Sequence, residues 1–233
     1  NLVKENRGID VEFDKDMGDA NVYKLWQNGE SVGIFQFESQ GMTNFMKELK
    51  PDCLEDIIAG VSLYRPGPMD QIPRYIKNKK NPENAEYTHP SLIPILNVTY
   101  GCMVYQEQVM QIVRDLAGYS LGRADLVRRA MGKKKLDVMA KERENFIHGQ
   151  VDENGNIIIK GCVRNGIDEA SANKIFDEMA EFAKYAFNKS HAAAYAVVSY
   201  RTAYLKAYYP EEFMAATLNS FLGNLDKIPM YID

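Results

Sequence analysis

The chain has 233 residues, of which 45% are hydrophobic and 26% are charged, and its net charge is -4. This composition is typical of a soluble globular protein that can build a core and fold into one or two domains. No apolar run approaches the roughly 20 residues that cross a bilayer, which excludes a membrane-spanning protein and a membrane partner. The sequence begins without Met and without a signal-peptide pattern, and it resembles a piece excised from a longer chain.

Cysteine and histidine are sparse. The cysteines, Cys53, Cys102 and Cys162, lie far apart, and no CxxC or HxxxH pattern occurs. An odd, scattered set of thiols is typical of a reducing compartment, so we expect a cytoplasmic protein without disulfides. The same spacing argues against a structural zinc site.

The first part of the chain predicts short helices separated by glycine and proline. Helices are expected over 19–29, 39–50 and 52–64, and the alternating segment VGIFQFE (32–38) predicts an extended or strand-like stretch. Asp52 and Glu55 have the spacing of a capping box. The RPGP sequence at 65–68 predicts a rigid, irregular turn, because its two prolines restrict the backbone.

The remainder of the chain is also mostly helical in pattern. Helices are expected over 104–117, 120–132, 133–148 and 168–187, followed by one to about residue 209 and another that begins at Pro210. Asn154-Gly155 before three isoleucines predicts a hairpin. The predicted fold class is therefore mainly α, a multi-helix domain with a small β-hairpin near 151–160.

A basic cluster stands out at LVRRAMGKKK (126–135). From Arg123 to Lys135 there are six basic residues and one acidic residue, Asp125. A helix dipole stabilises one or two cations at a helix end, whereas crowded like charges repel one another. The pattern therefore favours a phosphate-bearing ligand, with a solvated basic face as the alternative.

The segment FNKSHAAAYAVVSY (187–200) places polar and basic side chains at the start of a predicted helix. Lys184, Asn188, Lys189 and His191 gather there. Because the first N–H groups of a helix are unpaired and carry partial positive charge, this helix start suits an anion. An ordinary helix cap with exposed lysines is equally consistent with the residues. The tyrosines that follow could stack on a base, but their helical spacing favours core positions for most of them.

Two further segments have competing interpretations. The acids at Asp10, Glu12, Asp14 and Asp16 alternate as they would in a two-metal site, although a solvated acidic linker is the favoured interpretation. Arg65 lies in the stiff RPGP turn. The turn either holds the arginine in position for a ligand or has a structural role alone.

Several long motifs together resemble one protein family. GIFQFESQGM, DIIAGVSLYRPGPM, TYGCMVYQEQVMQI, RRAMGKKK and FNKSHAAAYAVVSYRTAYLKAYYPEEFMAA are similar to the C-family of bacterial replicative DNA polymerases, the DNA polymerase III alpha subunits. The resemblance extends from about Val32 to Asn224. It implies a multi-helix fingers domain over 32–224, a linker leaving the palm over 1–31, and the start of the connection to a clamp-binding region over 225–233.

The resemblance implies binding without catalysis. The family's metal-binding aspartates and its Mg²⁺ belong to a palm upstream of this segment, so this chain alone is expected to hold no catalytic or metal-binding residue and to be inactive. The expected role is that of the fingers of a template-directed DNA polymerase in chromosomal replication, a nucleotidyltransferase that is cytoplasmic and nucleoid-associated. The expected partners are deoxynucleoside triphosphates, primer-template DNA, the palm domain, and the sliding clamp and other replisome subunits through the parent protein.

Eight residues are carried over from the family as nucleotide-binding. Arg128 and Arg129 are expected to contact the triphosphate. The others are Asn188, Lys189, His191, Lys133, Lys184 and Arg65. Two alternatives remain open: a non-catalytic helical module that binds nucleic acid through 123–135, and a helical scaffold with incidental charge.

Overall fold

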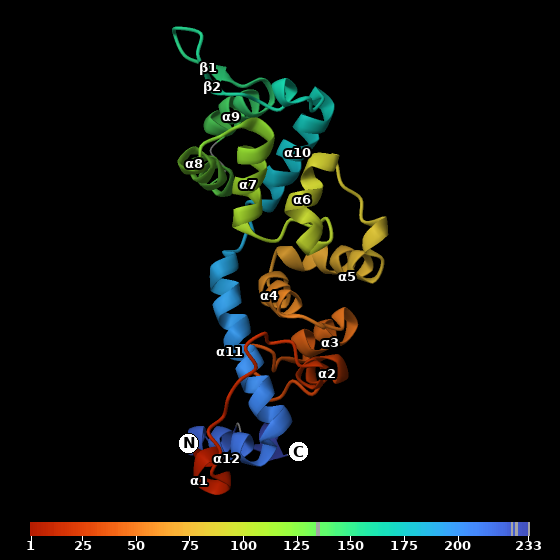
Figure 1. The fold of residues 1–233 in the computed structure, drawn as a ribbon, viewed down its shortest axis with the longest axis vertical. Helices are drawn as coiled ribbons and strands as arrows, with labels where there is room; N and C mark the ends of the chain where they lie inside the picture. Colours follow the sequence, from red (N-terminus) through yellow and green to blue (C-terminus); the bar gives the residue numbers. More distant parts are fainter. Residues whose placement is uncertain (134–135, 225, 227, 233) are drawn as a thin grey trace. The chain divides into compact units, whose positions relative to one another are not determined.

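The computed structural model describes residues 1–133, 136–224, 226 and 228–232. The chain divides into two compact units: unit 1 comprises Asn1–Tyr64 and Ser190–Asp233, and unit 2 comprises Arg65–Lys189. Figure 1 shows that helices dominate both units, and the described residues contain one small two-stranded sheet. The predicted fold class, mainly α with a small hairpin, is confirmed.

Unit 1 is entirely helical in its regular structure. Its helices are α1 (Leu2–Arg7), α2 (Ala20–Asn28), α3 (Gln40–Leu49), α4 (Leu54–Leu63), α11 (Lys189–Tyr208), α12 (Pro210–Ser220) and α13 (Pro229–Ile232). The predicted caps form: Asp19 accepts a hydrogen bond from the Asn21 N–H, and Ser39 accepts one from the Met42 N–H. A side-chain cap supplies a partner for N–H groups that the helix leaves unpaired.

Aromatic side chains form the core of unit 1. Trp26 is fully buried and contacts Phe37 edge to face, with ring centroids 5.6 Å apart. Tyr23 lies 5.6 Å from Tyr200, which is also fully buried. Tyr200 is therefore a core residue, as its helical spacing predicted, and aromatic pairs of this geometry stabilise a core beyond their area.

The extended or strand-like stretch predicted over 32–38 is wrong. The segment forms consecutive turns, with Gly33 and Gln36 in left-handed backbone conformation at φ 80° and 69°. Ile34 and Phe37 are both fully buried, because the turns point them to the same core. The alternating hydrophobic residues of this segment are therefore those that a folded loop buries, and they do not form a pleated strand.

The start of α4 also differs from the prediction. Its N-cap is Cys53 rather than Asp52, and the Asp52 N–H donates to the Asp56 carboxylate at 3.0 Å. Asp56 lies in the first turn of α4 and is buried, and its carboxylate reaches back to the residues that precede the helix.

Unit 2 carries the remaining elements. They are α5 (Ile72–Lys80), α6 (Ile93–Leu96), α7 (Gln106–Ala117), α8 (Leu121–Gly132), α9 (Leu136–His148), β1 (Gln150–Val151), β2 (Ile157–Ile159) and α10 (Glu169–Phe182). Short 3₁₀ segments connect them: η1 (Pro68–Gln71), η2 (Pro82–Asn84), η3 (Pro90–Leu92), η4 (Asn97–Thr99) and η5 (Val163–Asn165).

The core of unit 2 lies among α7, α8, α9 and α10. Ile112 and Val113 of α7 are fully buried, and Phe146 of α9 contacts Phe176 of α10 with ring centroids 5.8 Å apart. This packing of apolar helix faces is the main source of stability for a unit without a large sheet.

The hairpin forms where it was predicted. β1 and β2 are antiparallel, with Gln150 opposite Ile159 and a bulge before Val151. The Asp152 carboxylate accepts hydrogen bonds from the Asn154 and Asn156 N–H groups at 2.9 and 2.8 Å. Such a side-chain turn replaces backbone hydrogen bonds that the tight connection cannot make.

The cysteines are free thiols. Burial raises the pKa of Cys53 and Cys102 to about 11 and that of Cys162 to about 12. Among the described residues, no helix is both long and apolar enough to cross a membrane.

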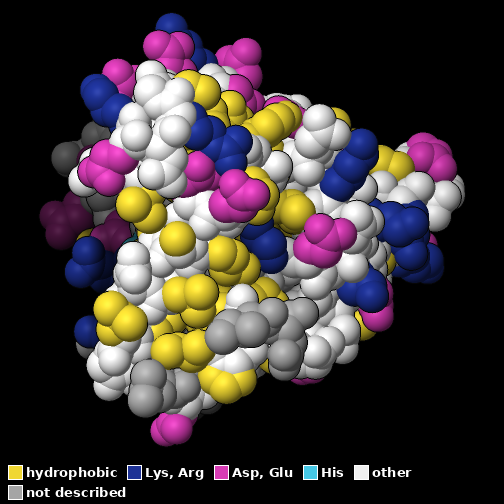
Figure 2. Space-filling view, turned by 90° about the horizontal axis from the view of Figure 1, so that it is seen from below, with side chains coloured by type: hydrophobic (Ala, Val, Ile, Leu, Met, Phe, Trp, Pro, Cys, Tyr) yellow, Lys and Arg dark blue, Asp and Glu magenta, His cyan; other side chains and the backbone are white. Residues whose placement is uncertain are grey.

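Charge is divided unevenly between the units. Unit 2 contains 19 basic and 16 acidic residues, whereas unit 1 contains nine basic and 16 acidic residues, so their net charges are +3 and -7. Figure 2, seen from the end where α1 and α12 lie in Figure 1, shows side chains of both signs around an area of hydrophobic side chains. The excess of positive charge therefore belongs to unit 2, which is the unit suited to a polyanionic ligand.

Candidate functional site

Arg128 and Arg129 both approach one carboxylate. On α8, Arg128 Nη2 lies 2.6 Å from Asp125 Oδ1, and Arg129 Nε lies 2.7 Å from Asp125 Oδ2. The hydrogen bond from Arg128 lowers the pKa of Asp125. The Arg128 side chain is 19% exposed, whereas that of Arg129 is 63% exposed. Asp125 therefore orients both guanidinium groups and leaves Arg129 the more accessible to a ligand.

The end of α8 lies against the end of α10. A methyl group at Gly132 would stand 3.3 Å from the carbonyl oxygen of Ala183, which is tighter than an ordinary contact and shows that the two helix ends pack closely. Lys133 follows Gly132, and Lys184 follows Ala183; both are exposed. The fold thus brings Gly132 and Ala183 close together, and each of them is followed by an exposed lysine. Lys134 and Lys135 of the predicted cluster lie outside the described residues.

Arg65 lies in a fixed position at the start of unit 2. Its guanidinium donates a hydrogen bond to the carbonyl of Tyr185 and stacks over the ring of Phe187, 4.3 Å from the centroid. Burial lowers the pKa of Arg65. Gly67 makes the close approach possible, because its φ of 103° and the neighbouring Tyr185 ring leave no space for a side chain.

Asn188 and Lys189 contact a carboxylate that sequence reasoning did not find. Asn188 Nδ2 donates to Glu107 Oε1 at 2.9 Å, and the Lys189 backbone N–H donates to both Glu107 oxygens at 3.2 and 3.1 Å. The Lys189 ammonium lies 5.1 Å from the ring centroid of Tyr105. The sequence predicted an anion at the start of α11. At the Lys189 N–H, that anion is the Glu107 carboxylate of the protein itself.

His191 belongs to unit 1, unlike the other seven predicted residues. It is exposed, and its ring lies 4.4 Å from that of Tyr195, one helical turn further along α11. The centroid of the Phe35 ring also lies 5.3 Å from that of Tyr195. These rings form an exposed or half-buried aromatic surface on which a base could stack.

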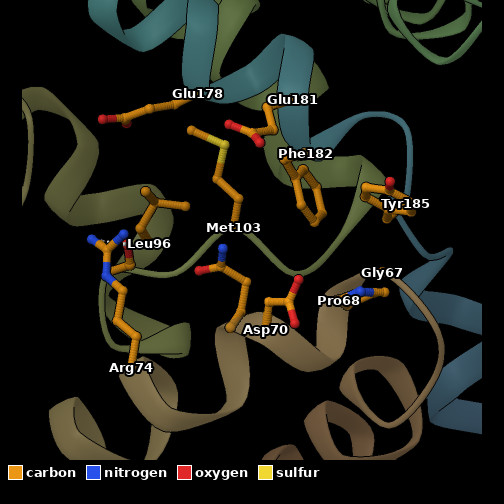
Figure 3. A pocket seen from close by; sticks show the side chains of 12 residues that line it. Gly67, Pro68, Asp70, Arg74, Leu96, Met103, Glu178, Glu181, Phe182 and Tyr185 are labelled. Carbon is orange, nitrogen blue, oxygen red and sulfur yellow. Dashed lines mark hydrogen bonds between the residues drawn. The ribbon is translucent and has the colours of Figure 1, made fainter.

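A cavity of about 390 Å³ opens in unit 2 beside the RPGP turn (Figure 3). Figure 3 shows the side chains of Glu178 and Glu181 on α10 facing Asp70 across Met103, with Arg74 at one side. Three carboxylates and one guanidinium make this lining net acidic, and an acidic lining repels phosphates. This cavity is therefore poorly suited to a phosphate group.

The acidic segment near the start of the chain makes internal contacts. The Asp14 carboxylate accepts hydrogen bonds from the Gly18 N–H at 2.8 Å and from the Tyr200 hydroxyl at 3.0 Å. Lys4 pairs with Asp10 at 2.7 Å. The segment thus contributes to the structure of unit 1.

Within the described part of the chain, one group of residues could bring three metal-binding atoms together: Asp52, Cys53 and Asp56. Its donors do not suit Mg²⁺, which takes oxygen ligands, because one of the three is a thiol whose pKa burial raises to about 11. The Asp56 carboxylate is also part of the α4 cap.

Comparison with known proteins places the chain in a family. Residues 1–154 match the family model described as the bacterial DNA polymerase III alpha subunit finger domain. Proteins named DNA polymerase III subunit alpha are similar over almost the whole chain. The one from Thermus aquaticus is 49% identical over 99% of this chain, and the one from Chlamydia trachomatis is 51% identical over 91%.

The chain spans only 18% of the Thermus aquaticus relative and 16% of the Chlamydia trachomatis relative. A relative from Rickettsia felis is 49% identical over 99% of this chain, and the chain spans 18% of that relative's length. The match therefore concerns one region of a much longer protein. Because the family model covers well over half of the chain, the chain belongs to the bacterial DNA polymerase III alpha subunit finger domain family.

Proposed function

We propose that this chain is the part of a replicative DNA polymerase that binds the incoming deoxynucleoside triphosphate. One observation carries the proposal: in a chain of the finger family, the exposed Arg129 lies on α8, whose end packs against the end of α10, and the exposed Lys133 and Lys184 directly follow these two helix ends. The primer-template end, a palm domain and other replication proteins are proposed partners of the whole protein. The proposed setting is the bacterial nucleoid.

Arg129 and Arg128 have the chemistry that a triphosphate requires. A guanidinium presents a planar fork of N–H donors to phosphate oxygens and remains charged at every relevant pH. Asp125 holds both groups before a ligand arrives, so little reorganisation is needed as charge develops during phosphoryl transfer. The contribution of this chain is binding and orientation of the substrate.

Mg²⁺ is part of the proposal only through the remainder of the parent protein. We propose that carboxylates of the palm hold the ion, where it would stabilise the charge of the reacting phosphates. The residues of this chain need no bound metal to contact the outer phosphate oxygens.

The test replaces Arg129 by Ala in the full-length subunit and measures single-nucleotide incorporation. A hydrogen bond to a charged group contributes roughly 1.5–3 kcal/mol, so we expect the KM for the nucleotide to rise about tenfold or more. The affinity for primer-template DNA should stay nearly constant. Arg128→Ala should have an effect in the same direction.

Arg114→Ala is the matched control. Arg114 is an exposed arginine of α7 paired with Asp115 at 2.7 Å, so its loss removes a comparable ion pair elsewhere in unit 2. We expect unchanged incorporation kinetics for this variant. Unaltered kinetics in both Arg128→Ala and Arg129→Ala would refute the proposed nucleotide contact.

A second candidate function, binding of a nucleic-acid backbone by unit 2, is favoured by the charge of α5. This helix exposes Arg74, Lys77 and Lys80 and contains no acidic residue. The affinity of the chain for DNA would then fall steeply as the salt concentration rises. The double variant Lys77→Ala/Lys80→Ala would reduce the slope of log affinity against log salt concentration by about two. Weak DNA binding with a shallow slope would favour the nucleotide-binding function alone.

A further inference from the structure

The first turn of α7 holds the segment that precedes α11. The Gln106 N–H donates to the Phe187 carbonyl at 2.9 Å, and Gln106 Nε2 donates to the Ala186 carbonyl at 3.1 Å. Tyr105 and Phe187 form an isolated parallel bridge. These contacts join residues about 80 positions apart, and they fix the backbone of the segment immediately before Asn188.

Glu107 completes this connection at the side chains themselves. Its carboxylate accepts from Asn188 Nδ2 at 2.9 Å and from the Lys189 N–H at 3.2 and 3.1 Å. A carboxylate at the start of a helix is stabilised by two effects: it accepts a hydrogen bond from an otherwise unpaired N–H, and its negative charge is attracted to the positive end of the helix dipole. Glu107 therefore holds Asn188 and the backbone of Lys189 in position within unit 2.

The base of this arrangement is rigid. Gln108 is 5% exposed, and its Oε1 accepts from the Val104 and Tyr105 N–H groups at 2.8 and 2.9 Å. Its Nε2 donates to Thr99 Oγ1 at 2.7 Å. A buried, fully bonded amide at this position locks the turn from which Glu107 projects. The three consecutive residues of the QEQ sequence thus act together, with Gln108 facing the core and Glu107 facing Asn188 and Lys189.

We propose that Glu107 is a positioning residue for nucleotide binding, acting through Asn188 and Lys189; this inference rests on the function proposed above. Because Glu107 already occupies the N–H of Lys189, the phosphates of the nucleotide do not take this backbone position. They are contacted instead by side chains whose origins Glu107 fixes. Loss of Glu107 leaves the chemistry of the site intact but moves its binding groups.

The experiment compares Glu107→Ala and Glu107→Gln in the full-length subunit by single-nucleotide incorporation. A hydrogen bond to a charged group is strong enough that its loss changes an equilibrium about tenfold. We expect Glu107→Ala to raise the KM for the nucleotide about tenfold, with kcat and primer-template affinity within about twofold. Glu107→Gln retains an oxygen that accepts from the Lys189 N–H, so its KM should rise by less than about threefold.

Asp168→Ala is the matched control for a purely structural cap. Asp168 caps α10 by accepting from the Ser171 N–H at 2.9 Å, and it has no role in the proposed site. A structural role alone for Glu107 would lower the active fraction in both alanine variants without raising KM. Equal KM values for Glu107→Ala, Asp168→Ala and the unmodified subunit would overturn the proposal.

Arg129→Ala, measured in parallel, separates this inference from the function on which it rests. A raised KM in Arg129→Ala with an unchanged KM in Glu107→Ala refutes the role of Glu107 only. An unchanged KM in Arg129→Ala refutes the nucleotide contact at α8. Faster hydrogen exchange at the Lys189 amide in Glu107→Ala, measured without nucleotide, tests the positioning contact independently of either; unchanged exchange would contradict it.

Discussion

Gly67→Ala is the substitution for which the structure gives the sharpest expectation. Gly67 has φ 103° and ψ -70°, and a methyl group there would lie 2.7 Å from both Cγ and Cε1 of Tyr185. The backbone at this position suits glycine alone, and the ring must move to admit a side chain. Gly166 supplies a matched comparison, because it also has positive φ, 84°, but has nothing within 4 Å of the added methyl group.

The two positions separate backbone strain from collision. At Gly166, a left-handed conformation costs an L-residue about 1 kcal/mol. At Gly67, a strained backbone costs about 1–3 kcal/mol, and displacing the half-exposed Tyr185 ring adds roughly 1 kcal/mol of lost burial. We therefore expect Gly67→Ala to lower the free energy of unfolding by about 3 kcal/mol and Gly166→Ala by about 1 kcal/mol.

Urea unfolding of the 233-residue chain, followed by circular dichroism, measures both changes. With a slope of about 2 kcal/mol per M, the two variants should differ in midpoint by roughly 1 M. Hydrogen exchange of 185–189 should rise in Gly67→Ala only, because Arg65 and the turn hold this segment. Equal midpoints in the two variants would refute the reasoning about the Tyr185 contact.

Three further predictions concern packing, charge and thiols. Ile112→Ala, in the core of unit 2, should lower the free energy of unfolding by about 2–5 kcal/mol, whereas Leu126→Ala, 66% exposed, should change it by less than about 0.5 kcal/mol in the same urea titration. The pKa of Asp125 is lowered by the hydrogen bond from Arg128, so its carboxylate stabilises the fold above the unfolded value of about 3.9, and this stabilisation is lost as the pH falls below it. Asp125→Asn should therefore lose less stability between pH 5 and pH 3 than the unmodified chain, as urea midpoints at the two pH values would reveal. Cys102 and Cys162 are buried with pKa values raised to about 11 and about 12, so iodoacetamide at pH 8 should label them only in urea, and mass spectrometry would detect any labelling of the native chain.

Much of the fold was predictable because its signals are local. Ser39 and Asp168 cap helices where the sequence indicated, and the Asn154-Gly155 turn produced the expected hairpin. The segment 32–38 was not predictable in this way, because a turn that buries every third residue and a strand can share one short apolar pattern. Its left-handed Gln36 is a conformation that tertiary packing imposes.

The candidate site was predictable in its cations but not in its carboxylates. Arg128 and Arg129 stand out as a cluster, and Lys189 stands out at a helix start. Glu107 gives no local sign of its role, because its partners are 81 and 82 positions away and only the fold brings them together. Asp125 was visible in the sequence, yet its pairing with both arginines depends on side-chain geometry.

Hydrogen exchange of the full-length subunit bound to primer-template DNA, with and without a non-hydrolysable deoxynucleoside triphosphate, tests the central claim most directly. The account predicts that nucleotide slows exchange at 128–133 and at 184–191, and that this protection is lost in Arg129→Ala. Protection confined to other segments, with both of these unchanged, would contradict it.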